Sequence, residues 1–202
     1  MKEKLIKSIV IIIVITIVTI LAVLTYFMLK DTKTTKVPNE TKYSCNVDKK
    51  MYMNRSVFYI TPKNNVNNIE NETNKTEKTI LYFHGGSYMA EATDEHWNFF
   101  EKVVNDTGAT VIMPDYPLAP KHNYKDVFEM VEPLYKEIVN SVGADNLIVM
   151  GDSAGGGLAL ALEEKLSQDN IEMPSKTILI SPWLDVRLKN PKIDDVQKTI
   201  SN

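Results

Sequence analysis

The chain has 202 residues, of which 44% are hydrophobic and 24% are charged, and its formal net charge is −3. This composition is typical of a globular protein, and the absence of a basic excess excludes a nucleic-acid-binding protein held by bulk charge. The single cysteine, Cys45, excludes an internal disulfide framework and a zinc site built from several cysteines.

An apolar segment runs from Ser8 to Leu29 without a charged residue, and three lysines precede it. About 20 apolar residues in a helix cross a hydrocarbon core of about 30 Å, and preceding positive charge places the N-terminus in the cytoplasm. No small-residue cleavage site follows the segment, which predicts an uncleaved signal-anchor. We therefore expect residues 1–30 to form a cytoplasmic tip and one transmembrane helix. The remaining chain would then lie on the extracytoplasmic side of the cell membrane.

Residues 31–50 are rich in lysine, threonine and asparagine, which predicts a tether. The folded domain is expected over residues 51–202. Its first strand is expected at 55–62, where apolar and polar residues alternate. The following segment, 63–78, is too polar to pack and predicts a solvated loop.

Short apolar runs and segments of helical periodicity alternate along the rest of the chain. Strands are expected within 79–86, 109–117, 146–153 and 176–185, and helices within 93–108, 124–143 and 154–168. Apolar strands that alternate with helices predict an α/β fold, in which helices cover both faces of a mostly parallel sheet. Ligands bind such sheets at the carboxyl ends of the strands.

The sequence G-D-S-A-G stands between a predicted strand and a predicted helix. A G-x-S-x-G turn in this context holds its serine in a strained conformation that tolerates only small neighbours. We therefore expect Ser153 to be a nucleophile and the Ala154 amide, at the helix start, to donate to an oxyanion. The other members of the turn are Gly151, Asp152 and Gly155. The alternative is a glycine-rich helix start that serves only close packing.

A second motif, H-G-G-S-Y, follows the predicted strand at 79–86. Two successive glycines allow backbone N–H groups to face a ligand without intervening side chains, as in loops that complete an oxyanion hole. We expect Gly85 and Gly86 to donate beside Ala154. A plain turn at the end of a strand is the alternative interpretation.

Over residues 79–188 the chain resembles the hormone-sensitive-lipase-like branch of the α/β-hydrolases. The resemblance rests on four motifs in order, F-H-G-G-S-Y, D-Y-P-L-A-P, G-D-S-A-G-G and L-I-S-P-W-L-D. It implies an α/β-hydrolase fold and a serine carboxylic-ester hydrolase of the esterase, lipase or acetyl-hydrolase type. A small-molecule ester is the implied substrate, with no metal and no organic cofactor. The resemblance also implies that His84 orients the oxyanion loop and that Asp152 is a neighbour of the nucleophile, not the triad acid.

The resemblance implies a triad in the order Ser, Asp, His, but all three histidines precede Ser153. His96 near a helix start is expected to be solvated or capping, and His122 to be a surface loop residue. We therefore expect a hydrolase domain that is incomplete at its C-terminus and lacks the triad Asp and His. A small-ligand-binding protein on the same scaffold, as in the gibberellin receptors that resemble this family, is an alternative. An inactive gene fragment is another, and the sequence carries no signal for an oligomeric state.

Overall fold

The computed structural model describes residues 13–22, 35, 43–63, 78–185, 187 and 189–193. The chain divides into two compact units, Met1–Lys33 and Thr34–Asn202.

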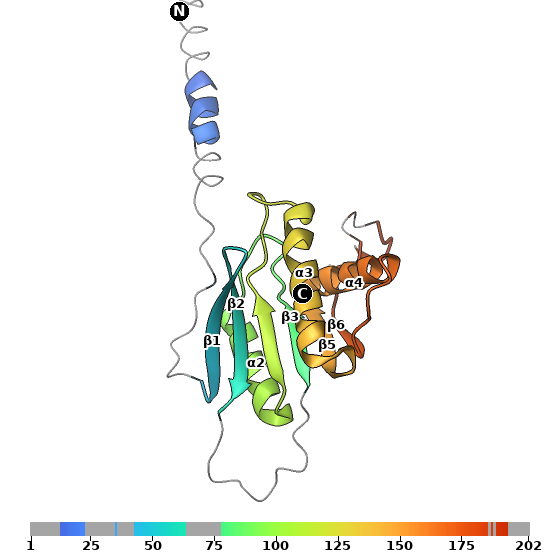
Figure 1. The fold of residues 1–202 in the computed structure, drawn as a ribbon. Coiled ribbons are helices and arrows are strands. Elements are labelled where there is room, and N and C mark those ends of the chain that lie inside the picture. The colour runs from blue at the N-terminus through green and yellow to red at the C-terminus, as the bar shows by residue number, and fades with distance from the viewer. Residues whose placement is uncertain are drawn as a thin grey trace, which may run out of the picture. The chain divides into compact units, whose positions relative to one another are not determined.

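In the first unit the described residues form one helix over 13–22, the blue helix of Figure 1. Ten helical residues at 1.5 Å each span about 15 Å, whereas a hydrocarbon core is about 30 Å thick. None of the helices among the described residues has the length and apolar character required to cross a membrane. On this finding the predicted transmembrane helix, and with it the single-pass extracytoplasmic localisation, is wrong. The rest of the predicted segment lies outside the described residues.

The second unit contains one six-stranded sheet in the order β1-β2-β4-β3-β5-β6 (Figure 1). The strands are β1 Cys45–Tyr52, β2 Arg55–Pro62, β3 Thr79–Phe83, β4 Thr110–Pro114, β5 Leu147–Asp152 and β6 Lys176–Ile180. The pairs β1–β2 and β2–β4 are antiparallel, and the other three pairs are parallel. The sheet is therefore mixed, with a parallel part that carries the predicted site motifs, as expected.

Strand β1 occupies part of the segment that was predicted to be a tether. It forms a hairpin with β2 in which Tyr52 pairs with Arg55. The two residues of the turn, Met53 and Asn54, have φ values of 47° and 62°. A two-residue turn with positive φ at both positions matches the twist of paired strands, so it continues the sheet where the composition predicted a linker.

Helices cover both faces of the sheet (Figure 1). They are α2 Asp94–Thr107, α3 Tyr124–Val142 and α4 Ser153–Gln168, and a short 3₁₀ helix, η3 Ala144–Asn146, precedes β5. Trp97 and Phe100 of α2 pack with one face of the sheet, and Leu134 of α3 and Leu162 of α4 pack with the other. This arrangement places the start of α4 at the end of the buried strand β5.

Candidate active site

Ser153 lies at the junction between β5 and α4, where no residue separates the strand from the helix. Its φ is 48°, in the left-handed region that costs a non-glycine residue conformational energy. Two glycines make the junction possible. A Cβ at Gly155 would lie 2.0 Å from the Phe83 carbonyl oxygen, and a Cβ at Gly151 would lie 2.4 Å from the Gly155 carbonyl oxygen. The backbone therefore turns within one residue only because both flanking positions lack a side chain.

The segment after β6 closes one side of this junction. The Trp183 amide donates a hydrogen bond to the Ser153 carbonyl oxygen at 2.8 Å. The Trp183 ring stacks on Tyr88 with a centroid distance of 6.0 Å. A Cβ at Gly157 would lie 2.7 Å from the Tyr88 hydroxyl, so Tyr88 packs against the first turns of α4. The S-P-W motif and the loop after β3 thus meet at Ser153.

His84 is fully buried beneath the loop after β3. Its ring stacks on Tyr116 at a centroid distance of 4.5 Å, and the Tyr116 hydroxyl donates to the His84 carbonyl oxygen at 2.6 Å. Burial lowers the pKa of His84, so the ring is neutral. Its Nδ1 lies 2.7 Å from the Gly85 carbonyl oxygen, which can only accept, so Nδ1 carries the proton. This contact fixes the conformation of the loop.

The amide of Gly85 is not directed toward an oxyanion. It donates to Asp152 Oδ1 at 2.7 Å, which departs from the donation to substrate expected from the sequence. The amides of Gly86 and Ala154 form no hydrogen bond with another described residue. Gly86 has a φ of 122°, and a Cβ there would lie 2.6 Å from the Ala90 carbonyl oxygen. The loop therefore requires glycine at this position.

Three donors surround one oxygen of the Asp152 carboxylate. Its Oδ1 accepts from the Gly85 amide and from the Tyr82 hydroxyl at 2.9 Å, and it lies 3.3 Å from Nε2 of His96. Burial favours the neutral acid, but the hydrogen bonds from His96, Tyr82 and Gly85 together hold the pKa of the Asp152 carboxyl below its usual range. Asp152 therefore ties the nucleophile junction to the loop after β3 and to α2.

Acid is expected to destabilise the domain through Asp152. Because its folded-state pKa is below the unfolded value of 3.8, its contribution is complete above that pH and is lost as pH falls toward the folded value. Asp152→Asn should therefore flatten the dependence of the melting temperature on pH below 3.8. Asp48→Asn, at an exposed carboxyl of β1, is the control and should retain the wild-type slope. If the melting temperatures of wild type and Asp152→Asn fell in parallel with pH, Asp152 would not contribute to the acid sensitivity of the domain.

None of the three histidines, all of which are described, forms a hydrogen bond or an ion pair with Ser153. His84 contacts its own loop, and His96 contacts Asp152 and Thr93. Nδ1 of His122 lies 3.5 Å from the Asp126 carboxylate at the start of α3. His96 does cap a helix, as expected, but its contact with Asp152 was not predicted.

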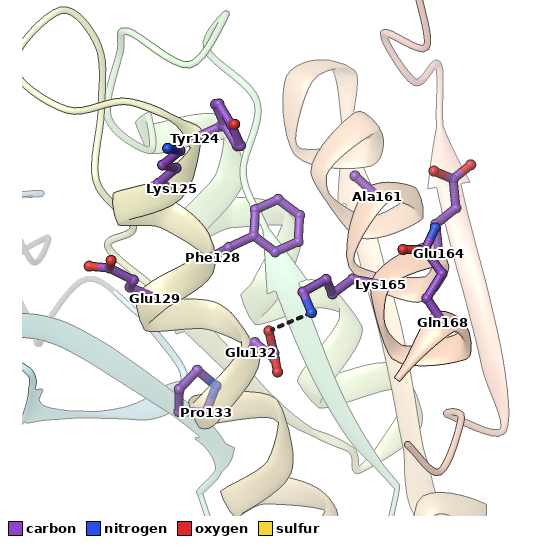
Figure 2. Close-up of a pocket in the computed structure, with 10 residues that line it drawn as sticks. All are labelled: Tyr124, Lys125, Phe128, Glu129, Glu132, Pro133, Ala161, Glu164, Lys165 and Gln168. Carbon is purple, nitrogen blue, oxygen red and sulfur yellow. Dashed lines mark ion pairs between the residues drawn. The ribbon is translucent and has the colours of Figure 1, made fainter. Parts of the chain in front are cut away.

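Two cavities border α3 and α4. The larger, about 680 Å³, lies in the groove between the two helices, where Glu132 and Lys165 form an ion pair at 3.7 Å (Figure 2). No predicted site residue lines it. The smaller, about 350 Å³, is lined by Tyr88 of the loop after β3, by Leu158 of α4 and by Val127 of α3. Tyr88, which lines the smaller cavity, packs against Gly157, one turn of α4 beyond Ser153, so the smaller cavity is the better candidate for a substrate group.

Comparison with known proteins agrees with the fold described above. A family model described as an alpha/beta hydrolase fold matches residues 80–201. Among solved structures, a candidate esterase from Staphylococcus aureus superposes with a TM-score of 0.74 at 29% identity, covering 86% of this chain and 56% of that one. The hormone-sensitive-lipase homologue EstE7 from a metagenome library gives a TM-score of 0.67 at 23% identity, covering 78% of this chain and 53% of that one.

The chain belongs to the family of the alpha/beta hydrolase fold, whose model matches more than half of its residues. An esterase from Acinetobacter venetianus is 35% identical over 120 residues, which cover 59% of this chain and 40% of that protein. A triacylglycerol lipase from Mycobacterium tuberculosis is 35% identical over 108 residues, which cover 53% of this chain and 25% of that protein. The chain thus spans less than half the length of the curated relatives it matches, and the predicted resemblance is confirmed.

Proposed function

We propose that the chain carries the nucleophile and the oxyanion donors of a serine carboxylic-ester hydrolase. The observation that carries the proposal is the strained backbone of Ser153 at the β5–α4 junction, together with the Gly86 and Ala154 amides, which have no hydrogen-bond partner among the described residues. Residues held in sparsely populated conformations cluster at active sites. The esterases and lipases among the relatives support the same reaction class.

In the proposed reaction Ser153 Oγ attacks the carbonyl carbon of an ester. The carbonyl electron pair moves onto oxygen, and the Gly86 and Ala154 amides stabilise the resulting oxyanion. One donor of this kind is worth about 2.7–4 kcal/mol in the transition state. Collapse of the intermediate expels the alcohol, which takes up a proton, and leaves Ser153 acylated until water releases the acid. Gly85, expected from the sequence to donate to the oxyanion, donates to Asp152 instead.

The Ser153 proton must pass to a general base as the C–O bond forms. No histidine of this chain contacts Ser153, so we propose that the triad Asp and His are not among its described residues. Without a triad base and acid, about 10³–10⁴-fold catalysis over water remains from the oxyanion donors and from binding. We therefore expect slow acylation of Ser153 and slower release.

A binding function is the second candidate, because the cavity of about 350 Å³ beside the junction is formed although no histidine contacts the serine. The test that separates the two is prolonged labelling by a fluorophosphonate, which phosphonylates a serine beside oxyanion donors, although slowly where no general base is present. Wild type should gain one label, and Ser153→Ala should gain none. Ser181→Ala is the matched control, because Ser181 also ends a strand with a positive φ of 43°. Equal labelling of wild type and Ser153→Ala would remove the hydrolase proposal.

We expect the smaller cavity to hold a short acyl group. Ala161 lines this cavity, and a larger side chain there would fill the space that the far end of a longer acyl group needs. Ala161→Phe should slow labelling by an octyl phosphonate about tenfold relative to a methyl phosphonate, in line with the effect of one or two methylenes in an apolar pocket. Glu164→Phe, which lines only the larger cavity, is the control. An equal effect on both reagents would place the acyl group elsewhere.

A further inference from the structure

The side chain of His96 links the first turn of α2 to the nucleophile junction. His96 is the third residue of the helix, and its Nδ1 lies 2.9 Å from the Thr93 backbone nitrogen and 3.0 Å from the Thr93 hydroxyl. This is a capping box in which histidine takes the place usually held by glutamate or glutamine. Neither of those residues would present a ring nitrogen to the far side.

The contact with Thr93 determines the protonation of the His96 ring. A backbone N–H can only donate, so Nδ1 must be the acceptor and carry no proton. The proton of the neutral ring therefore lies on Nε2. That nitrogen is 3.3 Å from Asp152 Oδ1, so the capping interaction directs a donor toward the carboxylate.

The same carboxylate oxygen receives the Gly85 amide at 2.7 Å. Gly86, a proposed oxyanion donor, directly follows Gly85, and the proposed nucleophile Ser153 directly follows Asp152. The hydrogen bond between Gly85 and Asp152 therefore joins the donor loop to the nucleophile junction. The two partners are 67 residues apart in sequence, and Asp152 is only half-buried. Without a fixed orientation, the carboxylate would be free to rotate toward water and release the Gly85 amide.

We propose that His96 is a positioning residue, which orients the Asp152 carboxylate so that it holds the Gly85 loop at a fixed distance from Ser153. The functional part of this inference rests on the proposed role of Ser153. Its structural part, the dependence of the Gly85–Asp152 bond on His96, does not. A role in capping alone would make any capping residue at position 96 equivalent.

Two substitutions separate positioning from capping. His96→Gln keeps an acceptor for Thr93 and an N–H for Asp152. His96→Glu keeps the capping acceptor but has no donor, and it places a second carboxylate beside Asp152. The matched control is Lys102→Glu, because Lys102 also lies beside a carboxylate, that of Asp106 at 3.6 Å on the same helix, and lines neither cavity. Should His96→Glu not fold, His96→Phe keeps the ring and removes both nitrogens.

The structural readout is the Gly85 amide in the full chain. His84–Gly85 is the sole His–Gly step in the sequence, so labelling histidine carbonyls with ¹³C and glycine with ¹⁵N isolates this amide in one NMR correlation. A hydrogen bond to a carboxylate moves the amide proton downfield. We expect the downfield signal in wild type, His96→Gln and Lys102→Glu, and its loss in His96→Glu. A wild-type signal in folded His96→Glu would overturn the proposal.

The functional readout is the rate of Ser153 labelling by a fluorophosphonate. A displacement of about 1 Å in a reacting group can cost about 10²-fold, so His96→Glu should be slower by about that factor. His96→Gln should stay within about threefold of wild type, and Lys102→Glu should be unchanged. Labelling of His96→Glu at the wild-type rate would show that His96 only caps the helix and does not position the site. If wild type itself is not labelled, the proposed function fails while the Gly85 signal still decides the coupling.

Discussion

Gly155→Ala is expected to destabilise the domain by at least about 3 kcal/mol, a large share of the stability of a domain of this size. The added methyl would lie 2.0 Å from the Phe83 carbonyl oxygen and 2.6 Å from the His84 carbonyl oxygen. Both atoms belong to the backbone where β3 ends, so no side chain can move aside. Relief requires α4 to shift away from β3, which would also move Ser153. The measurement is urea denaturation followed by circular dichroism.

Gly143→Ala provides the control for this experiment. Nothing lies within 4 Å of a Cβ at Gly143, so its φ of 80° is the main source of strain there. That substitution should cost about 1–2 kcal/mol. If Gly155→Ala were no more destabilising than Gly143→Ala, the close approach of α4 to the end of β3 would not be a feature of the protein in solution.

Gly86→Ala is expected to slow the labelling of Ser153 about 10²–10³-fold, the effect of removing one oxyanion donor. A φ of 122° is strained for a residue with a Cβ, and that Cβ would lie 2.6 Å from the Ala90 carbonyl oxygen. Relaxation of the loop therefore turns the Gly86 amide away from the position it now holds. The rate is measured with a fluorophosphonate at concentrations well below saturation.

Loss of folding has to be separated from loss of the donor in this experiment. Labelling rates are therefore compared only for protein that melts cooperatively, and Met89→Ala, an exposed position of the same loop, is the control. Met89→Ala should label at the wild-type rate. A folded Gly86→Ala variant with an unchanged rate would show that this amide does not take part in the reaction.

The order and kind of the elements from β2 onward could be predicted from local sequence, because each strand is a short apolar run and each helix has an apolar stripe. Strand β1 could not. Five of its eight residues are exposed, and its lysine-rich composition is that of a linker. Its pairing depends on a turn through Met53 and Asn54, which lacks the glycine typical of such turns.

The junction at Ser153 could also be predicted. Its turn leaves no room for a Cβ at two positions, and glycine stands at both of them in the sequence. The orientation of the donor loop could not. Whether the Gly85 amide faces a substrate or Asp152 depends on a carboxylate 67 residues away in sequence. The contact of His96 with that carboxylate likewise arises from packing of α2 on the sheet. The spacing of Thr93 and His96, which is that of a capping box, was the local signal that the His96 side chain folds back onto the helix start.

The most direct test of the account is a crystal structure of the chain after reaction with a small phosphonate. The phosphorus should be bonded to Ser153 Oγ, and one phosphonyl oxygen should lie about 2.7–3.1 Å from the amide nitrogens of both Gly86 and Ala154. The Gly85 amide should remain on Asp152. An adduct on another residue, or a phosphonyl oxygen that points away from both amides, would contradict the proposed site.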